Sequence, residues 1–514
     1  MSSAVPGQFT LVLHSHLPWL ANHGRWPVGE EWLYQSWAHS YQPLYAMLRR
    51  LAADGYTDQL SLGITPVLAA QLDDPHCAAS MYEWLADWQL RAVEAAMDDD
   101  RDRIALGHRE FRAAKAALED FETHWRHGGS SQIRGLLDSG VFELLGGPLA
   151  HPFQPLLDPR LRRLSLREGL ADAALRWGHR PTGIWAPECA YTPGMEAEYA
   201  AAGVGHFMVD GPTLRGDTAL GRPVAGSDVV AFGRDLTVSY RVWSPKSGYP
   251  GHAAYRDFHT YDHRTGFKPV RVTGKNVPGE AKKPYLPEAT AAVVDKHVDD
   301  FVACVRERLI AESERIGRPA LVVAGFDTEL FGHWWHEGPA WLEKVLRTLP
   351  QAGVSVGTLA SARAGGYVGE PVELGDSSWG SGKDWRVWEG PQVEHLVQLN
   401  SEVTATALDS LDKRGEHRDP GHRDPVADQI LRETLLTVQS DWPFMVSKDT
   451  AAGYAQDRAY KHAHATREIC AAADAGRDNR AGELAAGWRR ADNLFGALDA
   501  RRLPDRHGGD GGRR

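Results

Sequence analysis

The chain has 514 residues, of which 42% are apolar and 24% charged, as in a globular protein and unlike a disordered or fibrous one. Its formal net charge of −11 disfavours nucleic acid as a partner, and no apolar run approaches the roughly 20 residues of a membrane-spanning helix. The length exceeds that of one ordinary hydrophobic core and predicts two or three packed units.

Cysteine usage and the first residues of the chain indicate its compartment. The cysteines lie far apart, in no pattern that predicts a metal site or a disulfide framework: Cys77, Cys189, Cys304 and Cys470. The N-terminal stretch MSSAVPGQFTLVLHSHLPW has neither a basic segment nor a long apolar one, so no secretion signal is expected. These features predict a cytoplasmic protein with free thiols and no membrane association.

Short apolar segments alternate with helical ones through the first two thirds of the chain. Residues 9–15 predict a buried strand, and a helix is expected over residues 30–55, where Gly55 ends the amphipathic pattern. Further strands are expected at residues 59–65, 141–147, 183–187, 205–211, 228–234, 236–243, 320–327 and 354–358. Because strands separated by helices are typical of parallel sheets, this order predicts an α/β barrel or a barrel-like sheet.

Two regions have no strand pattern and are expected to be helical. Residues 78–136 predict an almost continuous helical insertion on the barrel rim, and the chain becomes helical again from about residue 390. The helices expected there are 393–413, 427–439, 459–475 and 481–495. The charged, Pro- and Gly-bearing residues 414–425 are expected to form a solvated loop between two of them.

These patterns predict three consecutive regions of the chain. A catalytic barrel is expected over residues 1–365, including the insertion, and a C-terminal helical domain over residues 366–503. The Gly- and Arg-rich tail, residues 504–514, is expected to be disordered.

Polar side chains directly follow four of the expected strands. His14 and His16 come at and after the end of the first strand, His151 follows the third, Glu188 follows the fourth, and Asp327 ends the most apolar one. Polar residues in such loops are usually surface solubilisers, but active sites are commonly built at the carboxyl ends of barrel strands. Their recurrence at equivalent strand ends predicts one site on that face of the barrel.

Two of these residues are carboxylates, the pairing that glycosidic-bond chemistry uses. One carboxylate attacks or stabilises C1 of the sugar, while the other protonates the leaving oxygen. Each acid alone has a simpler interpretation, as a solvated loop residue or, for Asp327 beside Thr328, as a helix N-cap. The sequences around Glu188 and Asp327 are rich in Trp and His, which favours the site.

Tryptophan and histidine side chains leave further alternatives open. The 18 tryptophans indicate either core filling or a cleft in which indole faces stack on sugar rings. The pair His14 and His16, with the later stretch HWWHE, could hold a divalent metal ion, although HWWHE differs from the zinc-binding pattern H-E-x-x-H. Hydrogen bonding of His14, His16 and His151 to sugar hydroxyls is the favoured interpretation.

Six stretches, in order along the chain, resemble characteristic regions of glycoside hydrolase family 57. They are HSHLPW, ELLGGPLAHPFQPLL, GIWAPECAY, GFDTELFGHWWHEGP, SSWGSGKDWRVW and SDWPF. The segment VWSPKSGYPGHAAYRDF is similar to the family's α-1,4-glucan branching enzymes, of actinobacterial type, rather than to its amylases. The resemblance runs from residue 9 to about residue 500. It implies an α/β fold, an incomplete TIM-like (β/α)7 barrel with a helical insertion and a C-terminal all-helical domain.

The resemblance also implies a retaining double displacement. Glu188 matches the nucleophile that forms a covalent glycosyl-enzyme, and Asp327 matches the general acid/base. In such sites the two carboxyl groups lie about 5–5.5 Å apart. Asp327 has to be protonated at the start of the cycle, so its pKa is expected to be raised by burial and by the charge of Glu188. No metal and no organic cofactor is implied, and Cys189 is expected to pack rather than react.

Further residues match positions that bind substrate. The donor subsite is matched by His14, His16 and His151. The wall of the cleft is matched by Trp379, Trp388, Asp441 and Trp442. Tyr249 matches a tyrosine at the tip of a mobile loop, and the Gly-Tyr-Pro-Gly composition favours a flexible lid. Trp185 and Arg271 are also expected to reach the substrate.

The favoured function is that of an α-1,4-glucan branching enzyme, which moves a segment from an α-1,4 linkage to a C6 hydroxyl. The expected partner is an α-glucan polysaccharide such as amylose, glycogen or a modified α-glucan, and the oligomeric state stays open. A hydrolase (α-amylase) or 4-α-glucanotransferase of the same family is the alternative within this chemistry. A metal-dependent amidohydrolase and a non-catalytic glucan-binding protein are alternatives from other classes.

Overall fold

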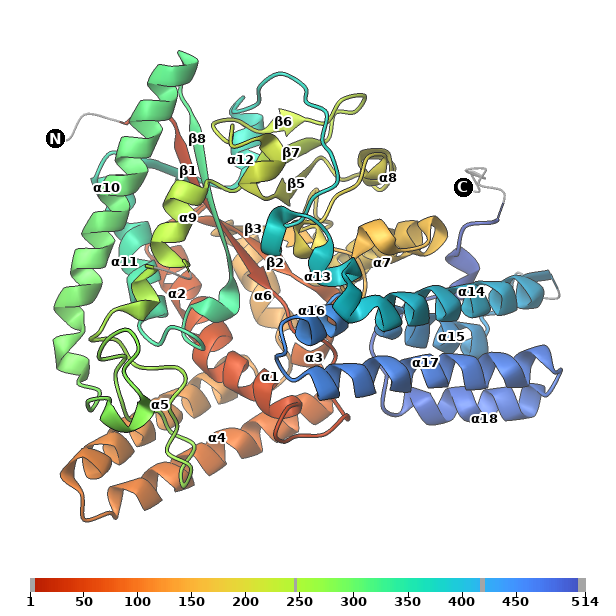
Figure 1. Ribbon diagram of the computed structural model, residues 1–514, viewed down its shortest axis with the longest axis horizontal. Coiled ribbons are helices and arrows are strands. Elements are labelled where there is room, and N and C mark those ends of the chain that lie inside the picture. The colour runs from red at the N-terminus through yellow and green to blue at the C-terminus, as the bar shows by residue number, and fades with distance from the viewer. Residues whose placement is uncertain (1–4, 245–246, 417–420, 507–514) are drawn as a thin grey trace.

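A computed structural model gives the fold and describes residues 5–244, 247–416 and 421–506. At its centre is one sheet with the strand order β6-β7-β5-β4-β3-β2-β1-β8, and β9 lies beside β1 (Figure 1). The strands are β1 Gln8–Ser15, β2 Leu60–Ile64, β3 Phe142–Gly146, β4 Gly183–Ile184, β5 His206–Val209, β6 Arg222–Pro223, β7 Val230–Gly233, β8 Leu321–Asp327 and β9 Ser355–Gly357. All pairings are parallel except that between β6 and β7.

Seven of these strands form a barrel that is incomplete on one side. Along the path from β7 to β8 each strand pairs with the next, but among the described residues no ladder joins β7 to β8. The two meet through a backbone hydrogen bond, from Asp235 N–H to the Val323 carbonyl oxygen at 2.7 Å. The Arg234 guanidinium crosses the same gap to the Gly325 carbonyl oxygen at 3.4 Å. The expected incomplete (β/α)7 barrel is therefore present, with its seam between β7 and β8.

The strand expected at residues 236–243 is wrong, because the chain forms helix α9 there, Leu236–Val242. The Asp235 carboxylate caps this helix by accepting a hydrogen bond from Val238 N–H at 3.1 Å. Val238 and Val242, four residues apart, are buried, and the helix packs against β8 and α10. The branched residues alone suggested a strand, but the cap and this packing determine the helix.

Helices cover the barrel and add a long hairpin at its rim. Helices α4, Pro75–Ala96, and α5, Arg101–His124, form this hairpin at the bottom of Figure 1, within the region where the sequence predicts an insertion. The others in this part are α1 Glu30–Ser36, α2 Gln42–Ala53, α3 Pro66–Leu72, α6 Ser130–Asp138, α7 Pro159–Trp177, α8 Met195–Ala201, α10 Ala291–Ile316, α11 Gly338–Gln351 and α12 Leu359–Ala364. A π-helical turn joins α1 to α2, so the helix expected over residues 30–55 is one run of three segments.

Six further helices form a C-terminal part beside the barrel (Figure 1). They are α13 Arg386–Glu389, α14 Glu394–Glu416, α15 Pro425–Thr437, α16 Asp441–Ser447, α17 Ala452–Asp474 and α18 Asp478–Arg489. Helix α15 is central, because every residue from Val426 to Thr437 is buried and α14, α17 and α18 pack around it. The four long helices expected from the sequence are present. Of the expected loop, residues 417–420 lie outside the described residues, as does the tail after residue 506.

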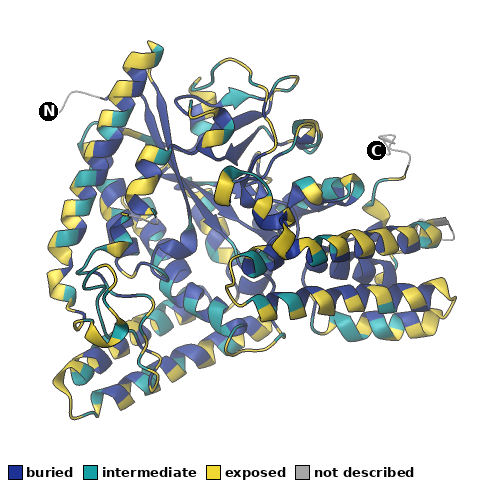
Figure 2. Cartoon of the chain, viewed as in Figure 1, coloured by how far each residue is buried: buried dark blue, intermediate teal, exposed yellow. Residues whose placement is uncertain are grey.

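The barrel strands are covered on both faces, which explains their unbroken apolar sequences. All eight residues of β1 are buried, and Figure 2 shows the sheet in dark blue while the outer helices carry exposed faces. In register, His14 of β1 lies beside Asp327 of β8 on one side and beside Gly63 of β2 on the other. The parallel register thus aligns polar residues at the carboxyl ends of neighbouring strands.

Two further observations concern the helices and the cysteines. Within the described residues, no helix has the length and apolar character needed to cross a membrane. The four cysteines are free thiols, and all four are buried.

Substituting Gly183 tests the packing of the barrel interior. A Cβ there would lie 2.1 Å from His206 Nε2, which is already held 2.6 Å from a carboxylate oxygen of Glu143. We expect Gly183→Ala to destabilise the protein by about 1–3 kcal/mol, because overpacking displaces neighbours. Gly482→Ala in α18 is the control, since its Cβ would meet no neighbouring atom within 4 Å and alanine favours a helix. Denaturant unfolding should give a lower midpoint only for Gly183→Ala; equal midpoints would contradict this account.

Candidate active site

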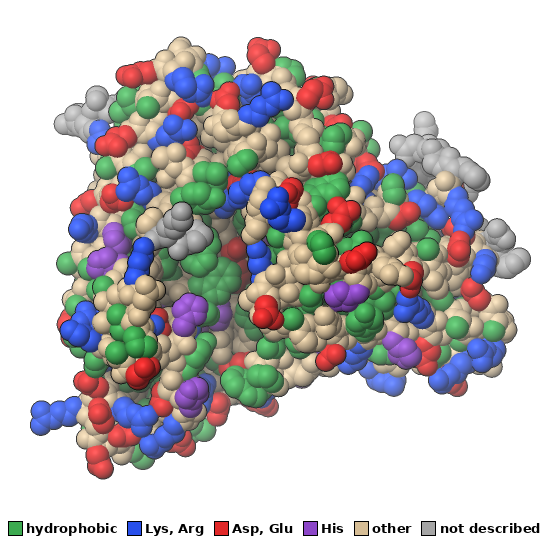
Figure 3. All heavy atoms as spheres, viewed as in Figure 1, with side chains coloured by type: hydrophobic (Ala, Val, Ile, Leu, Met, Phe, Trp, Pro, Cys, Tyr) green, Lys and Arg blue, Asp and Glu red, His purple; other side chains and the backbone are tan. Residues whose placement is uncertain are grey.

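The residues expected at the strand ends converge at one end of the barrel. His16, after β1, has its Nε2 3.1 Å from both carboxylate oxygens of Asp441 at the start of α16. His14, within β1, has its Nε2 3.1 Å from Nε2 of His151, in the loop after β3. Figure 3 shows the molecule hollowed near its centre, between the barrel on one side and the C-terminal helices on the other.

Glu188 lies in a turn with unusual backbone geometry. It follows β4 in the 3₁₀ turn Pro187–Cys189, and both Glu188 and Cys189 have positive φ angles, 59° and 48°. Such backbone is rare for residues other than glycine and costs free energy, so the surroundings must hold it in place. Trp379 N–H does so by donating to the Glu188 carbonyl oxygen at 2.9 Å. The turn thereby fixes the direction in which the Glu188 side chain points.

Two side chains donate hydrogen bonds to the Glu188 carboxylate, which is only 8% exposed as a residue. Ser440 Oγ donates to Oε1 at 2.7 Å, and Trp379 Nε1 donates to Oε2 at 2.9 Å. The pKa of Glu188 is raised to about 7, mainly by burial; Asp441 also raises this pKa, while the two hydrogen bonds and His16 lower it. Both carboxylate oxygens are therefore fixed, and the donors favour the ionised form.

Asp327 ends β8 in a different environment. It precedes the 3₁₀ turn Thr328–Leu330, but its carboxylate makes no capping hydrogen bond, so the helix-cap interpretation is wrong. Burial raises the pKa of Asp327 to about 6, while the positive charges of Arg234 and His16 lower it. The expected rise is present with burial as its cause, but the expected contribution from the charge of Glu188 is not among the causes.

Cys189, directly after Glu188, packs in the core. It is 2% exposed, and burial raises the pKa of its thiol well above the ordinary value. A nucleophilic cysteine needs a lowered pKa. The environment of Cys189 is therefore that of a packing residue.

Imidazole and indole rings stack beside the two carboxylates. The rings of His14 and Trp185 are 9° from parallel with centroids 4.6 Å apart, and those of His16 and His151 have centroids 3.7 Å apart. Trp185 is 2% exposed, so its face is covered by His14 and is not open to a sugar. His16 and Asp441 keep 10% and 13% of their side chains exposed. These two are therefore the polar groups of this cluster that a ligand can reach.

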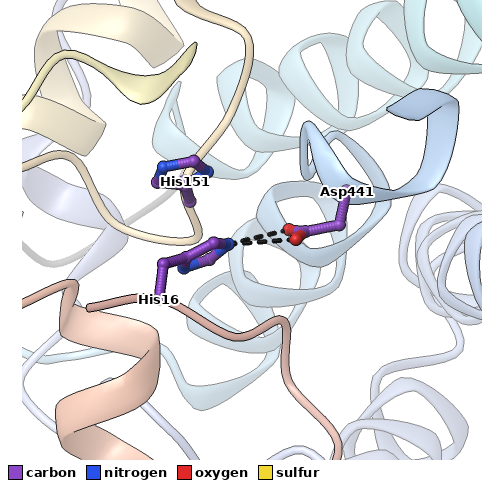
Figure 4. Close-up of side chains that lie close together, drawn as sticks. All are labelled: His16, His151 and Asp441. Atoms are coloured by element: carbon purple, nitrogen blue, oxygen red, sulfur yellow. Dashed lines mark hydrogen bonds and ion pairs between the residues drawn. The ribbon is translucent and has the colours of Figure 1, made fainter. Parts of the chain in front are cut away.

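One group of side chains in the site has the ligand types and spacing of a metal centre. His16, His151 and Asp441 come from three separate elements, and Figure 4 shows His151 lying over His16, which points to Asp441. A metal ion binds in the plane of an imidazole ring. Because the two rings are stacked face to face, 20° from parallel, a single ion cannot lie in both planes. Direct hydrogen bonds account for the arrangement, and this geometry does not fit a metal ion.

A second group of possible ligands, His23, His462 and Asp492, lies where the loop after β1 meets the C-terminal helices. Lys461 Nζ donates to His23 Nδ1 at 3.1 Å, and Arg458 donates to His462 Nε2 at 2.9 Å. The other ring nitrogens therefore carry the protons and donate to carboxylates. A metal ion would have to displace both protons beside two cations, so this group does not fit one either.

Two tryptophans expected on the cleft wall are core residues in this structure. Trp442 and Trp388 are 0% and 1% exposed. Trp442 Nε1 donates to the Leu436 carbonyl oxygen at 2.8 Å, with the Arg458 guanidinium over its ring. Trp388 stacks on Phe153 with centroids 4.7 Å apart. Neither indole presents a face to a sugar, because both faces are packed.

Among the described residues, no hydrogen bond joins Tyr249 or Arg271 to the carboxylate of Glu188 or Asp327. The Tyr249 ring stacks on His297 with centroids 4.3 Å apart, and its hydroxyl donates to Asp300 at 2.5 Å. Both partners belong to α10, so Tyr249 is anchored on a helix and is only 7% exposed. Arg271 N–H donates to the Lys283 carbonyl oxygen at 2.9 Å. The composition around Tyr249 suggested mobility, but partners far along the chain hold the ring.

The structure adds site residues that the sequence reasoning missed. Ser440, within the singled-out SDWPF motif, contacts Glu188 directly. Arg234, one residue beyond β7, pairs with Asp210 beyond β5 at 2.9 Å, and its guanidinium lies 5.4 Å from the Trp379 ring centroid. Asp210 and Arg234 follow strands as the other site residues do, so their positions carried a signal, whereas the signal for Ser440 was its place in the SDWPF motif.

A further buried acid, Glu329, lies two residues after Asp327. The Tyr41 hydroxyl and the His16 N–H both donate hydrogen bonds to its Oε1. Burial raises the pKa of Glu329 to about 8, and the charge of Asp327 raises it as well. Glu329 therefore fixes the main chain of His16.

Two sequence profiles match this chain. Residues 10–362 match "Glycosyl hydrolase family 57", and residues 401–502 match "1,4-alpha-glucan branching enzyme, C-terminal". The chain belongs to glycoside hydrolase family 57. The resemblance seen in the six sequence stretches is thus confirmed.

This family 57 chain has close and distant relatives with similar descriptions. It is 67% identical, over 98% of its length and 99% of theirs, to probable 1,4-alpha-glucan branching enzymes of two Mycobacterium tuberculosis strains. It is 32% identical to the 1,4-alpha-glucan branching enzyme of Thermococcus kodakarensis, over 89% of this chain and 72% of that one.

Several solved structures share the fold. The branching enzymes of Pyrococcus horikoshii and Thermococcus kodakaraensis match with TM-scores of 0.90 and 0.91, each at 28% identity and over 97% of both chains. The α-amylase AmyC of Thermotoga maritima has a similar fold, with a TM-score of 0.84 at 24% identity over 97% of this chain and 99% of that one.

Removal of metal ions tests the interpretation of the His16, His151 and Asp441 cluster. Exhaustive dialysis against EDTA should leave the turnover of amylose within about twofold of the untreated value, because hydrogen bonds satisfy the cluster without an ion. Zinc added to the untreated protein should not raise the rate. Loss of activity that returns with stoichiometric Zn²⁺ would contradict this interpretation and favour a metal-dependent hydrolase.

Proposed function

We propose that this protein is an α-1,4-glucan branching enzyme, which cleaves an α-1,4 linkage and transfers the released segment to a C6 hydroxyl to form an α-1,6 branch. The C-terminal profile and the branching-enzyme relatives support this over hydrolysis. The observation that carries the proposal is the pair of carboxylates at the barrel mouth, Glu188 buried and Asp327 intermediate in exposure. Glu188 accepts two hydrogen bonds, whereas no described side chain caps or bridges Asp327 in the same way.

The two carboxylates are proposed to act in a retaining double displacement. Glu188 Oε attacks C1 while Asp327 gives its proton to the leaving O4, so that a glycosyl-enzyme ester forms and the α-1,4 bond breaks. Asp327 then takes the proton of an acceptor C6 hydroxyl. The acceptor oxygen attacks C1, the ester bond breaks, and Glu188 returns as a carboxylate. Because each step inverts C1, the product keeps the α configuration.

The proposed donor subsite is built from the partly exposed polar groups. His16 and Asp441 would hydrogen-bond sugar hydroxyls, and His151 stacks behind His16 and fixes its ring. Trp379, intermediate in exposure, is the indole beside Glu188 that is best placed to meet a sugar face. Trp388 and Trp442 are proposed to act indirectly, by packing the segments that carry the site.

The two profiles support the proposed division of the chain. The catalytic barrel is proposed to span residues 1–365, close to the matched range 10–362, and the helical domain that completes the site residues 366–503, which include the matched range 401–502. The proposed substrate is an α-glucan such as amylose, glycogen or a modified form. A cytoplasmic location is proposed from the four buried, unpaired cysteines.

Replacing the proposed nucleophile tests the function. Glu188→Gln keeps the hydrogen-bonding shape but cannot form the ester, so branching of amylose should fall by about three orders of magnitude or more. New α-1,6 linkages would be scored by proton NMR and released reducing ends by a colorimetric assay. Wild type should give branches with few reducing ends. Reducing ends without branches would identify a hydrolase, and an active Glu188→Gln variant would exclude the mechanism.

The pH dependence of the reaction follows from the two carboxyl groups. The reactive form has Glu188 ionised and Asp327 protonated, and burial raises the pKa values of the two to about 7 and about 6. Between about pH 6 and 7 the two groups together carry about one proton, and the fraction of molecules in the reactive form is highest there. Initial branching rates should be maximal in that window. They should fall below it as Glu188 is protonated and above it as Asp327 ionises. A rate that keeps rising to pH 9 would contradict this assignment.

A further inference from the structure

A chain of buried side chains connects β1 to the Glu188 carboxylate. His14 Nε2 lies 3.1 Å from His151 Nε2, and His151 Nδ1 lies 2.9 Å from Ser440 Oγ. Ser440 Oγ lies 2.7 Å from Glu188 Oε1. The four residues come from β1, the loop after β3, the residue before α16 and the turn after β4, and all four are buried. The chain therefore links the barrel to the C-terminal helices.

When Glu188 is ionised, the number of available hydrogens allows only one donor-to-acceptor direction along this series of hydrogen bonds. A carboxylate can only accept, so Ser440 must donate its one hydroxyl hydrogen to Glu188. The Ser440 oxygen then accepts from His151 Nδ1–H. Burial, with the neighbouring imidazoles, lowers the pKa of both His14 and His151, so each is neutral and carries one N–H. His151 Nε2 is consequently a bare acceptor and receives the Nε2–H of His14.

An independent feature of the structure agrees with this direction. If His14 carries its hydrogen on Nε2, its Nδ1 has a lone pair and needs no acceptor. That atom is buried and makes no hydrogen bond with any described residue. In the reverse direction a buried N–H would lack an acceptor, which is the more costly state.

We propose that Ser440 is a positioning residue, which holds Oε1 of the nucleophile Glu188 in place and favours its ionised form. It can do so because His14 and His151 orient the serine hydroxyl, so that its hydrogen is donated to Glu188. This inference rests on the proposed function of Glu188. Trp379 holds the other oxygen, so the carboxylate has lost its freedom to rotate. A hydrogen bond from Ser440 N–H to the His151 carbonyl oxygen at 3.0 Å keeps the serine in place.

The Ser440→Ala variant tests this proposal, with Ser410→Ala as the matched control. Ser410 is equally buried in the C-terminal part and donates to a carboxylate, Asp474, at 2.6 Å, but this pair is separate from the site. Removing the Ser440 donor disfavours the Glu188 anion, while the charged groups that face it, Asp441 and His16, are unchanged. We expect kcat/KM on amylose to fall about tenfold at pH ~5, and the deficit to shrink below about twofold by pH ~8.5. Ser410→Ala should match wild type at both pH values.

The dependence of the deficit on pH separates positioning from loss of structure. A loss of the same size at every pH, or no loss, would overturn the proposal. Ser440→Cys, of similar size with a weaker donor, should lie between wild type and Ser440→Ala at low pH, and it replaces the alanine variant if that does not fold. Glu188→Gln is measured in parallel. An active Glu188→Gln variant would contradict the proposed function. If Glu188→Gln is inactive but the loss of activity in Ser440→Ala does not depend on pH, only the inference about Ser440 is contradicted.

Discussion

The burial of the Glu188 carboxylate is the constraint on which the rest of the site depends. A carboxylate removed from water must receive hydrogen bonds from the protein or take up a proton. Its side-chain donors are Trp379 and Ser440, and both lie after residue 365, beyond the strands of the barrel. The barrel sets the direction of the Glu188 carboxylate, and the C-terminal part supplies the hydrogen-bond donors that favour its charged form. The helical part is therefore a component of the proposed active site.

The two carboxyl groups differ in hydrogen bonding more than in burial. Burial raises both pKa values, to about 7 for Glu188 and about 6 for Asp327. Taken alone, these values favour Asp327 as the more acidic group, which is the reverse of what a double displacement uses. The donors on Glu188 favour its anion, whereas no described side chain donates a hydrogen bond to the Asp327 carboxylate. Substrate displaces water from both groups, and the two hydrogen bonds from Ser440 and Trp379 then keep the Glu188 anion favoured.

The sequence predicted what depends on local pattern and missed what depends on distant contacts. His14, Glu188 and Asp327 could be found because each lies at the end of an apolar strand, and parallel strands bring their ends together. Ser440 could not, because its role depends on His151, 289 positions away. The match of the SDWPF motif predicts Trp442 on the cleft wall, but a motif does not show which faces of an indole are covered by other residues.

The residues with left-handed backbone near Glu188 also limit where parts of two family 57 proteins can be joined in a chimera. Ala150, His151, Glu188 and Cys189 all have positive φ angles. The first two lie beside the pairing of Pro152 with Gln439, the residue before Ser440. A chimera that joins this barrel to another protein's helices has to reproduce that pairing, or the grafted serine will miss its carboxylate. Crossover points after α16 leave the pairing intact, so chimeras built there keep Ser440 and Glu188 from the same parent protein.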